Sequence, residues 1–198
     1  MIKVLLFGPS LGAVSGVSTH LNQLFDSGLS DRYQLLHFQV GSEGRQENKL
    51  QKLYRLFISP FTLLFYLVKH RPILVHLNTS LEPKAFWRDS VYLLIAKLLG
   101  TKVVLQVHGG ELPEEFIPGS PFLTGLIQKI LFIPDVIVVL ASLELNAYQH
   151  FVPGQRVDVV PNAIEIQIHE PKLTVIKPER FLHLVYLGRI FKEKGVFE

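Results

Sequence analysis

The chain has 198 residues, and 20 Lys and Arg against 17 Asp and Glu give it a formal net charge of +3 at pH 7. Hydrophobic residues make up 48% and charged residues 19%, which excludes an intrinsically disordered chain. The 14 Gly and 12 Pro are near their average share, which excludes collagen-like and low-complexity sequences. The length allows one large domain, or one domain and the beginning of another.

The chain contains no cysteine. A disulfide framework, a Cys-ligated zinc site and a thiol nucleophile are therefore excluded. The apolar stretch at 4–7 is too short for a signal peptide, and no stretch reaches the roughly 20 apolar residues that a spanning helix needs. We expect a cytoplasmic protein.

Short runs of Val, Ile and Leu alternate with longer amphipathic segments along the chain. The runs predict strands at 2–8, 33–40, 73–78, 102–108, 136–140 and 157–160. The segments between them predict helices from a cap at Ser15 or Ser18 to Gly28, over 48–70 with a break near Pro60, and over 83–99, 123–133 and 142–151. Gly100 is expected to end the third of these helices, and Ser142 to cap the last.

Unbroken apolar strands are typical of a parallel sheet that helices cover. Their alternation with helices predicts an α/β fold with a doubly wound, Rossmann-like parallel sheet. Ligands of such sheets bind beyond the carboxyl ends of the strands. We therefore expect functional residues at 8–16, 78–82, 108–111, 141–144 and 162.

The composition changes after residue 165. Residues 166–180 are polar and contain Pro and both kinds of charge, which is typical of a linker. Residues 181–187 predict one more strand. We therefore expect a first domain over 1–165, a linker over 166–180 and the first strand and turn of a second domain over 181–198.

Basic residues are concentrated between Arg45 and Arg71, where six Lys and Arg accompany a single Glu. An uncharged run rich in Phe and Leu lies within this stretch, at 56–68. It fits a buried helix, and it also fits an interfacial helix whose basic flanks attract an anionic membrane surface. A nucleic-acid partner is disfavoured, because the basic excess is confined to this one stretch.

Two short motifs suggest other chemistry. Residues 8–12 match G-x-S-x-G, which would make Ser10 the nucleophile of a serine hydrolase. The strand before this motif begins at residue 2, which leaves no upstream segment for the usual oxyanion loop. Glycines 8, 12 and 16 give only a weak dinucleotide fingerprint, and the eight histidines show no close metal-ligand spacing.

Four further segments lie near predicted strand ends. They are Gly-Val-Ser-Thr-His at 16–20, Val-His-Gly-Gly at 107–110, Val-Pro-Asn-Ala-Ile-Glu at 160–165, and Tyr-Leu-Gly-Arg-Ile-Phe-Lys-Glu-Lys-Gly-Val at 186–196. Together they resemble the motifs of the retaining GT-B glycosyltransferases of family 4, and the fourth segment is the most specific. Ser15 and Ala163 stand where that family has glycine.

This resemblance implies the N-terminal half of a GT-B fold and transfer of a sugar, with retention, from an NDP-sugar to a glycan or lipid-linked acceptor. It implies that Arg189, Lys194 and the helix start at Gly16 hold the donor diphosphate without a metal, since negative charge grows there as the glycosidic bond breaks. His108 is the implied catalytic residue beside the transferred sugar. The other implied site residues are Gly12, Ser15, Val17 and His20 in the acceptor-side loop, and Asn162 at the hinge.

The same family carries an acidic pair, E-x7-E, in its second domain. No residues correspond to this pair before the sequence ends at Glu198, so we expect the chain to be inactive alone. A lipid-linked or envelope polysaccharide acceptor would suit a peripheral position at the inner face of the cytoplasmic membrane. A Rossmann-like binding module without catalysis is the main alternative.

Overall fold

The computed structural model describes residues 1–116 and 119–163. They belong to one compact unit, Met1–Ile164. The predicted linker at 166–180 and the predicted second-domain strand at 181–187 lie outside the described residues.

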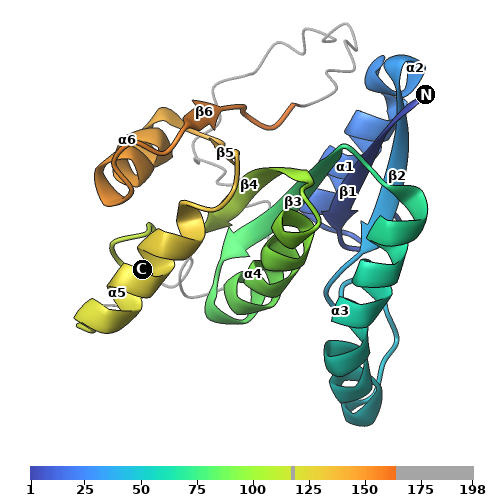
Figure 1. Ribbon diagram of the computed structural model, residues 1–198, viewed down its shortest axis with the longest axis horizontal. Coiled ribbons are helices and arrows are strands. Elements are labelled where there is room, and N and C mark those ends of the chain that lie inside the picture. Colours follow the sequence, from blue (N-terminus) through green and yellow to red (C-terminus); the bar gives the residue numbers. More distant parts are fainter. Residues whose placement is uncertain (117–118, 164–198) are drawn as a thin grey trace, which may run out of the picture. The chain divides into compact units, whose positions relative to one another are not determined.

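A six-stranded parallel sheet forms the centre of this unit (Figure 1). Its strands are β1 (Ile2–Gly8), β2 (Tyr33–Gln39), β3 (Leu74–Leu81), β4 (Lys102–Gly110), β5 (Val136–Val139) and β6 (Val157–Val159). The spatial order is β2-β1-β3-β4-β5-β6, and every neighbouring pair is parallel. The predicted doubly wound α/β fold is confirmed. From β1 the chain runs out to the edge strand β2 and then returns past β1 to β3. The topological switch point therefore lies between β1 and β3.

Six helices accompany the sheet in the described part of the chain. They are α1 (Gly16–Asp26), α2 (Leu29–Arg32), α3 (Lys49–His70), α4 (Pro83–Leu98), α5 (Pro121–Leu131) and α6 (Ser142–Phe151). Ser15, one of the two predicted caps, accepts the N–H of Ser18 at 3.2 Å and begins α1. Gly100, with φ +73°, follows the end of α4 as predicted. None of these helices is long and apolar enough to cross a membrane.

The predicted break at Pro60 is wrong, because α3 continues through it. A proline inside a helix removes one backbone hydrogen bond. Here the helix is fixed on both sides of that position. Ser59 shares a hydrogen bond of 2.6 Å with the Tyr92 hydroxyl of α4, and Leu63 and Leu67 are buried in the core.

Two other expectations about helices need correction. Ser142 does not cap α6 but is its first residue. Instead, the Glu144 carboxylate in the first turn accepts hydrogen bonds from the backbone N–H groups of Leu140 and Ala141, at 2.8 and 3.0 Å. These bonds give the N–H groups just before the helix an acceptor. The four-residue helix α2 was not predicted, since it buries none of its residues and so shows no apolar periodicity.

Alternate residues of β1 belong to two separate apolar clusters. Leu5 and Phe7 join a large cluster with residues of α3, α4, α5 and α6. Val4 and Leu6 join a small cluster with Leu21 of α1. Because successive strand side chains point to opposite faces, α1 packs on one face of the sheet and the four later helices on the other.

Candidate functional site

Four polar side chains lie on the α1 face of the two central strands. Leu77 separates His76 from Asn78 on β3, and Val107 separates Gln106 from His108 on β4. The register pairs Asn78 with Gln106, so all four side chains project from the same face. They lie toward the carboxyl ends of the strands and beside the switch point, where ligands of doubly wound sheets bind.

His20 of α1 joins this group from above the sheet. It is only 7% exposed, and its ring centroid lies 4.9 Å from that of His108 and 6.2 Å from that of His76. The Nε2 atom of His76 lies 2.8 Å from Oε1 of Gln106. We call His20, His76 and His108 the histidine cluster. The structure thus brings together His20 and His108, which were expected from two separate motifs.

A chain of hydrogen bonds fixes the tautomer of His108. The Asn78 amide donates through Nδ2 to the carbonyl oxygen of Phe7 at 2.7 Å, which directs its Oδ1 toward His108. The distance from that oxygen to Nε2 of His108 is 2.7 Å. Since the amide oxygen can only accept, Nε2 of His108 carries the proton. Nδ1 therefore carries a lone pair and no proton, and this buried atom has no partner among the described residues.

The histidine cluster is uncharged at neutral pH. Burial, reinforced by the neighbouring His20 and His76, lowers the pKa of His108 to about 3. Burial lowers the pKa of His76 to about 4, although the bond to Gln106 opposes this, and burial also lowers the pKa of His20. A positive charge on one of these neighbouring imidazoles would disfavour a charge on the others. The cluster therefore offers neutral hydrogen-bonding groups.

The loop between β1 and α1 lies next to the cluster and is tied to the helix. The Ser18 hydroxyl donates to the carbonyl of Ser10, and the Asn22 amide donates to the carbonyl of Leu11, each at 2.9 Å. Gly12 and Gly16 do not adopt positive φ. A Cβ atom on Gly16 would meet nothing within 4 Å, so the start of α1 is open on that side.

The other members of the predicted acceptor-side loop have structural contacts. Val17 packs against the small cluster that includes Leu21. Ser15 is occupied in capping α1, and its hydroxyl also lies 3.0 Å from that of Ser18. Helix geometry leaves the N–H groups of Gly16 and Val17 without an acceptor inside α1.

Glycines end β4 directly after His108. Gly109 and Gly110 have φ of +87° and +102°, a region that favours glycine. A Cβ atom on Gly110 would lie 2.6 Å from the backbone nitrogen of Leu81. The end of β4 therefore approaches β3 closely, which holds His108 against Asn78.

The structure does not support the hydrolase alternative. A nucleophile elbow places its serine on a sharp turn between strand and helix. Here seven residues separate β1 from α1. The Ser10 hydroxyl accepts from the Gly12 N–H at 3.4 Å, and no histidine within residues 1–116 or 119–163 hydrogen-bonds to it.

The remaining predicted residues lie after β6. Asn162 is exposed. The carbonyl of its neighbour Ala163 accepts a hydrogen bond of 3.0 Å from Gln23 of α1, so the segment that leaves β6 reaches α1. Arg189 and Lys194 lie outside the described residues, and their role at a diphosphate stays a prediction. Over the described ranges, no group of three or more His, Asp or Glu is arranged to hold a metal ion.

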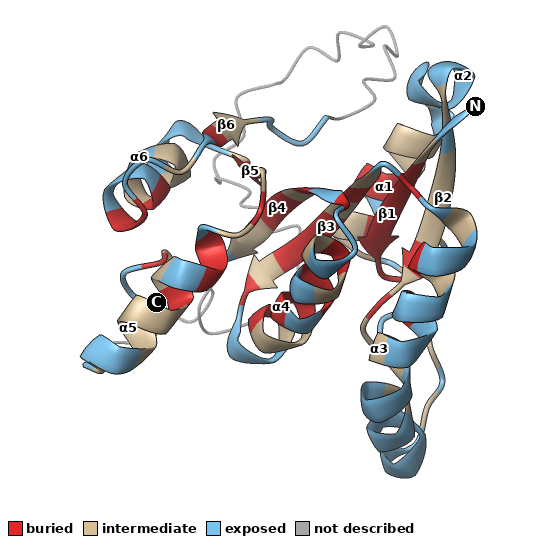
Figure 2. Ribbon diagram, viewed as in Figure 1, coloured by how far each residue is buried: buried red, intermediate tan, exposed pale blue. Residues whose placement is uncertain are grey.

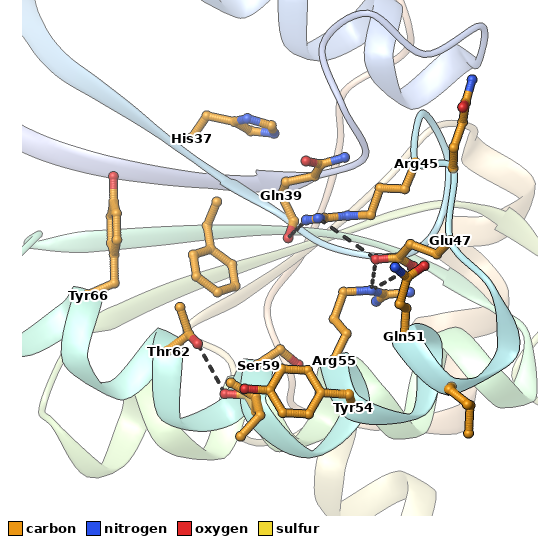
Figure 3. Close-up of a pocket in the computed structure, with 14 residues that line it drawn as sticks. His37, Gln39, Arg45, Glu47, Gln51, Tyr54, Arg55, Ser59, Thr62 and Tyr66 are labelled. Carbon is orange, nitrogen blue, oxygen red and sulfur yellow. Dashed lines mark hydrogen bonds and ion pairs between the residues drawn. The ribbon is translucent and has the colours of Figure 1, made fainter.

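A cavity of about 800 Å³ lies between β2 and α3 and is lined by α3 residues from Leu50 to Tyr66 (Figure 3). Apolar rings and chains form much of its wall, including Phe38, Tyr54 and Tyr66. Arg45 reaches into it and donates to the backbone carbonyl of Gln39 at 3.4 Å. Its Nε atom has no partner in the described part of the chain.

Sequence reasoning missed His76 and Gln106. It placed Asn78 in the expected site segment 78–82 but assigned it no specific role. A signal for all three was present. Polar residues two positions apart interrupt the apolar runs of β3 and β4, and a spacing of two places them on one face of a strand.

The described fold is that of an α/β protein with a Rossmann-like sheet and a polar site at its switch point. No protein-family model and no curated protein matches the chain. Among solved structures, the chain is similar to Staphylococcus aureus MnaA in a co-structure with UDP, with a TM-score of 0.53 and 12% identity. The match covers 82% of this chain and 44% of that one, so this chain spans less than half the length of MnaA.

A second similar structure is pyridoxal kinase from Entamoeba histolytica, with a TM-score of 0.41 and 13% identity over 76% of this chain and 54% of that one. The likeness to MnaA shows the fold alone.

Proposed function

We propose that this chain is the acceptor-side part of a retaining glycosyltransferase that takes its sugar from a nucleoside diphosphate. The observation that carries this proposal is the buried Nδ1 of His108, a hydrogen-bond acceptor with no partner among the described residues. A buried polar atom without a partner is costly, and a bound hydroxyl group would satisfy it. Sugars supply such hydroxyls.

Three features support a nucleotide sugar as the donor. The site lies at the switch point of a Rossmann-like sheet, beside the open start of α1 at Gly16. Helix N-termini attract phosphate groups. The structurally similar MnaA was solved with UDP. The predicted cations Arg189 and Lys194 would complete the diphosphate site.

His108 acts in this proposal by positioning the sugar. Its Nδ1 accepts a hydrogen bond from a hydroxyl group of the transferred sugar. Because its pKa is lowered to about 3, the ring is a poor base and stays neutral. Asn78 orients the ring, and the charge that develops on the leaving diphosphate is stabilised elsewhere, by α1 and the predicted cations.

The acceptor in this proposal is a glycan or a lipid-linked glycan. The cavity between β2 and α3 supports this choice, since ligand pockets combine apolar and aromatic walls with a few polar groups. Here Tyr54 and Tyr66 supply aromatic rings and Arg45 supplies an unsatisfied donor.

The test is to incubate the full-length protein with a panel of nucleotide sugars and with glycan and lipid-linked acceptors. NMR would follow release of the nucleoside diphosphate and the anomeric configuration of the product. We expect turnover of at least one donor, with the configuration retained.

An inverted product would contradict the retaining mechanism. Donor binding without transfer or hydrolysis in the full-length protein would show instead a binding module without catalysis. Failure to bind any nucleoside diphosphate or nucleotide sugar would overturn the proposal.

A further inference from the structure

The outward face of α3 is apolar along almost its whole length. Six large hydrophobic side chains lie on it, each of them at least 41% exposed. They are Leu53, Phe57, Phe61, Leu64, Phe65 and Val68. We call these six residues the α3 stripe. Figure 2 shows that the N-terminal end of α3, which projects from the domain, is almost wholly exposed.

The spacing of the α3 stripe places its members on one side of the helix. They recur at intervals of three and four residues, which is the repeat of a single helical face. Leu63 and Leu67, the two buried residues of the helix, lie at other positions around the helix axis. The stripe is therefore a second apolar face, in addition to the face that packs on the sheet. Among the described residues, nothing covers it enough to bury it.

Only the second half of α3 packs closely on the sheet, through Leu63 and Leu67. In the first half every residue from 49 to 54 is exposed. Tyr54 and Ile58 of this half line the cavity together with Phe38 of β2. The first turns therefore project from the domain, where they can contact a large external surface.

The charges around the stripe have one sign. Lys49, Lys52, Arg55, Lys69 and Arg71 lie on or next to α3. No Asp or Glu occurs from residue 48 to residue 81, and Glu47 is engaged by Arg55 at 2.9 Å. Lys and Arg side chains beside aromatic and leucine side chains are typical of helices that lie in the plane of an anionic membrane surface.

We propose that α3 docks this protein on an anionic lipid bilayer, with the α3 stripe among the acyl chains and the flanking Lys and Arg at the headgroups. The charge favours lipid over a second copy of the chain, because two copies joined through this face would bring two basic helices together. The inference does not depend on the sugar chemistry proposed above.

The test is flotation of the chain with phosphatidylcholine vesicles that contain 0% or about 30% phosphatidylglycerol, the anionic lipid of the bilayer. We expect binding to the anionic vesicles that weakens in high salt. The double variant F57D/F61D should reduce the bound fraction at least tenfold, since it places two carboxylates where acyl chains would lie.

F122D/L143D is the matched control. Phe122 on α5 and Leu143 on α6 are as exposed as Phe57 and Phe61, but they lie away from α3. This variant should bind like the parent chain. Thermal unfolding of each variant would establish that it is folded.

A second measurement does not rely on loss of binding. Phe57→Trp should give tryptophan emission that shifts to shorter wavelength with anionic vesicles and is quenched by brominated acyl chains, whereas Phe122→Trp should not. The single native Trp87 contributes the same background to both.

Either of two results would overturn the proposal. The first is no vesicle binding at low salt by the folded parent chain. The second is a dimer in solution that F57D/F61D dissociates while vesicle binding is unchanged, which would make the stripe an interface between copies.

Discussion

Asp89 shows how a single buried charge supports the central strands. Its carboxylate accepts from Nε and Nη2 of Arg88, at 2.7 and 2.8 Å, and from the Thr79 hydroxyl of β3 at 2.8 Å. Burial raises the pKa of Asp89, while the bonds from Arg88 and Thr79 act in the opposite direction. The group therefore ties α4 to the carboxyl end of β3, on the face of the sheet opposite to the histidine cluster.

We predict that Asp89→Ala lowers the free energy of unfolding by about 3 kcal/mol, because it leaves Arg88 partly buried without its partner. Urea unfolding would measure the loss. Asp26→Ala, at an exposed position at the end of α1, is the control and should change stability by less than about 0.5 kcal/mol. Equal effects of the two substitutions would refute this role for Asp89.

Like Asp89, the histidine cluster depends on partners from neighbouring elements. The role of His108 depends on Asn78, whose orientation depends in turn on the carbonyl of Phe7. Three strands thus contribute to the state of one imidazole. His108 is the residue proposed to contact the sugar, and its tautomer is set by Asn78 and Phe7, which do not contact the sugar in this proposal.

At the scale of elements, the close approach of β4 to β3 holds this arrangement. Gly110 has φ +102°, and a Cβ atom there would lie 2.6 Å from the backbone of Leu81. At position 110, a residue other than glycine would therefore have an unfavourable backbone conformation, and its Cβ atom would clash with the backbone of Leu81.

Gly110→Ala should lower the free energy of unfolding by about 3 kcal/mol, combining backbone strain with a backbone clash. Gly100→Ala is the matched control. Gly100 also has positive φ, but a Cβ atom there would meet nothing within 4 Å, so its cost should be only about 1 kcal/mol. Similar losses for both, measured by urea unfolding, would mean that the close approach to Leu81 is unimportant.

At the scale of the whole molecule, burial of the histidine cluster links folding to pH. His76 and His108 have pKa values of about 4 and about 3 in the folded protein, against about 6.5 in an unfolded chain. Above pH 6.5 neither state binds protons at these sites. As the pH falls from 6.5 toward 4, the unfolded chain gains protons that the folded protein excludes, so stability is lost.

We predict a loss that rises to about 1.4 kcal/mol per pH unit for each such histidine as the pH falls through this range. His76→Gln should reduce the slope of stability against pH, measured by urea unfolding at pH 7, 6 and 5. His150→Gln, at an exposed position of α6, should leave the slope unchanged. An identical slope for the parent chain and both variants would contradict neutral, buried histidines.

Much of this fold could be predicted, because its strands are unbroken apolar runs and their alternation with helices allows few arrangements. The helix at α2 could not, since a four-residue turn has no periodicity. Continuation of α3 through Pro60 depends on the contact of Ser59 with Tyr92, which is 33 residues away. Local sequence contains no such information.

The site was predictable in part. His20 and His108 were expected from their motifs, but their contact depends on how α1 packs over β3 and β4. His76 and Gln106 were overlooked because each is a single polar residue inside an apolar strand. Their partners come from the neighbouring strand, and only the register reveals them.

The kinetic effect of removing His108 from the full-length protein tests the central claim most directly. For the donor found in the nucleotide-sugar panel, His108→Ala should reduce kcat/KM by about 10²-fold, the usual cost of losing one hydrogen bond that orients a reacting group. His150→Ala should stay within about twofold of the parent. If His108→Ala also stayed within about twofold while folding normally, the donor sugar would not bind at the histidine cluster and the account would be wrong.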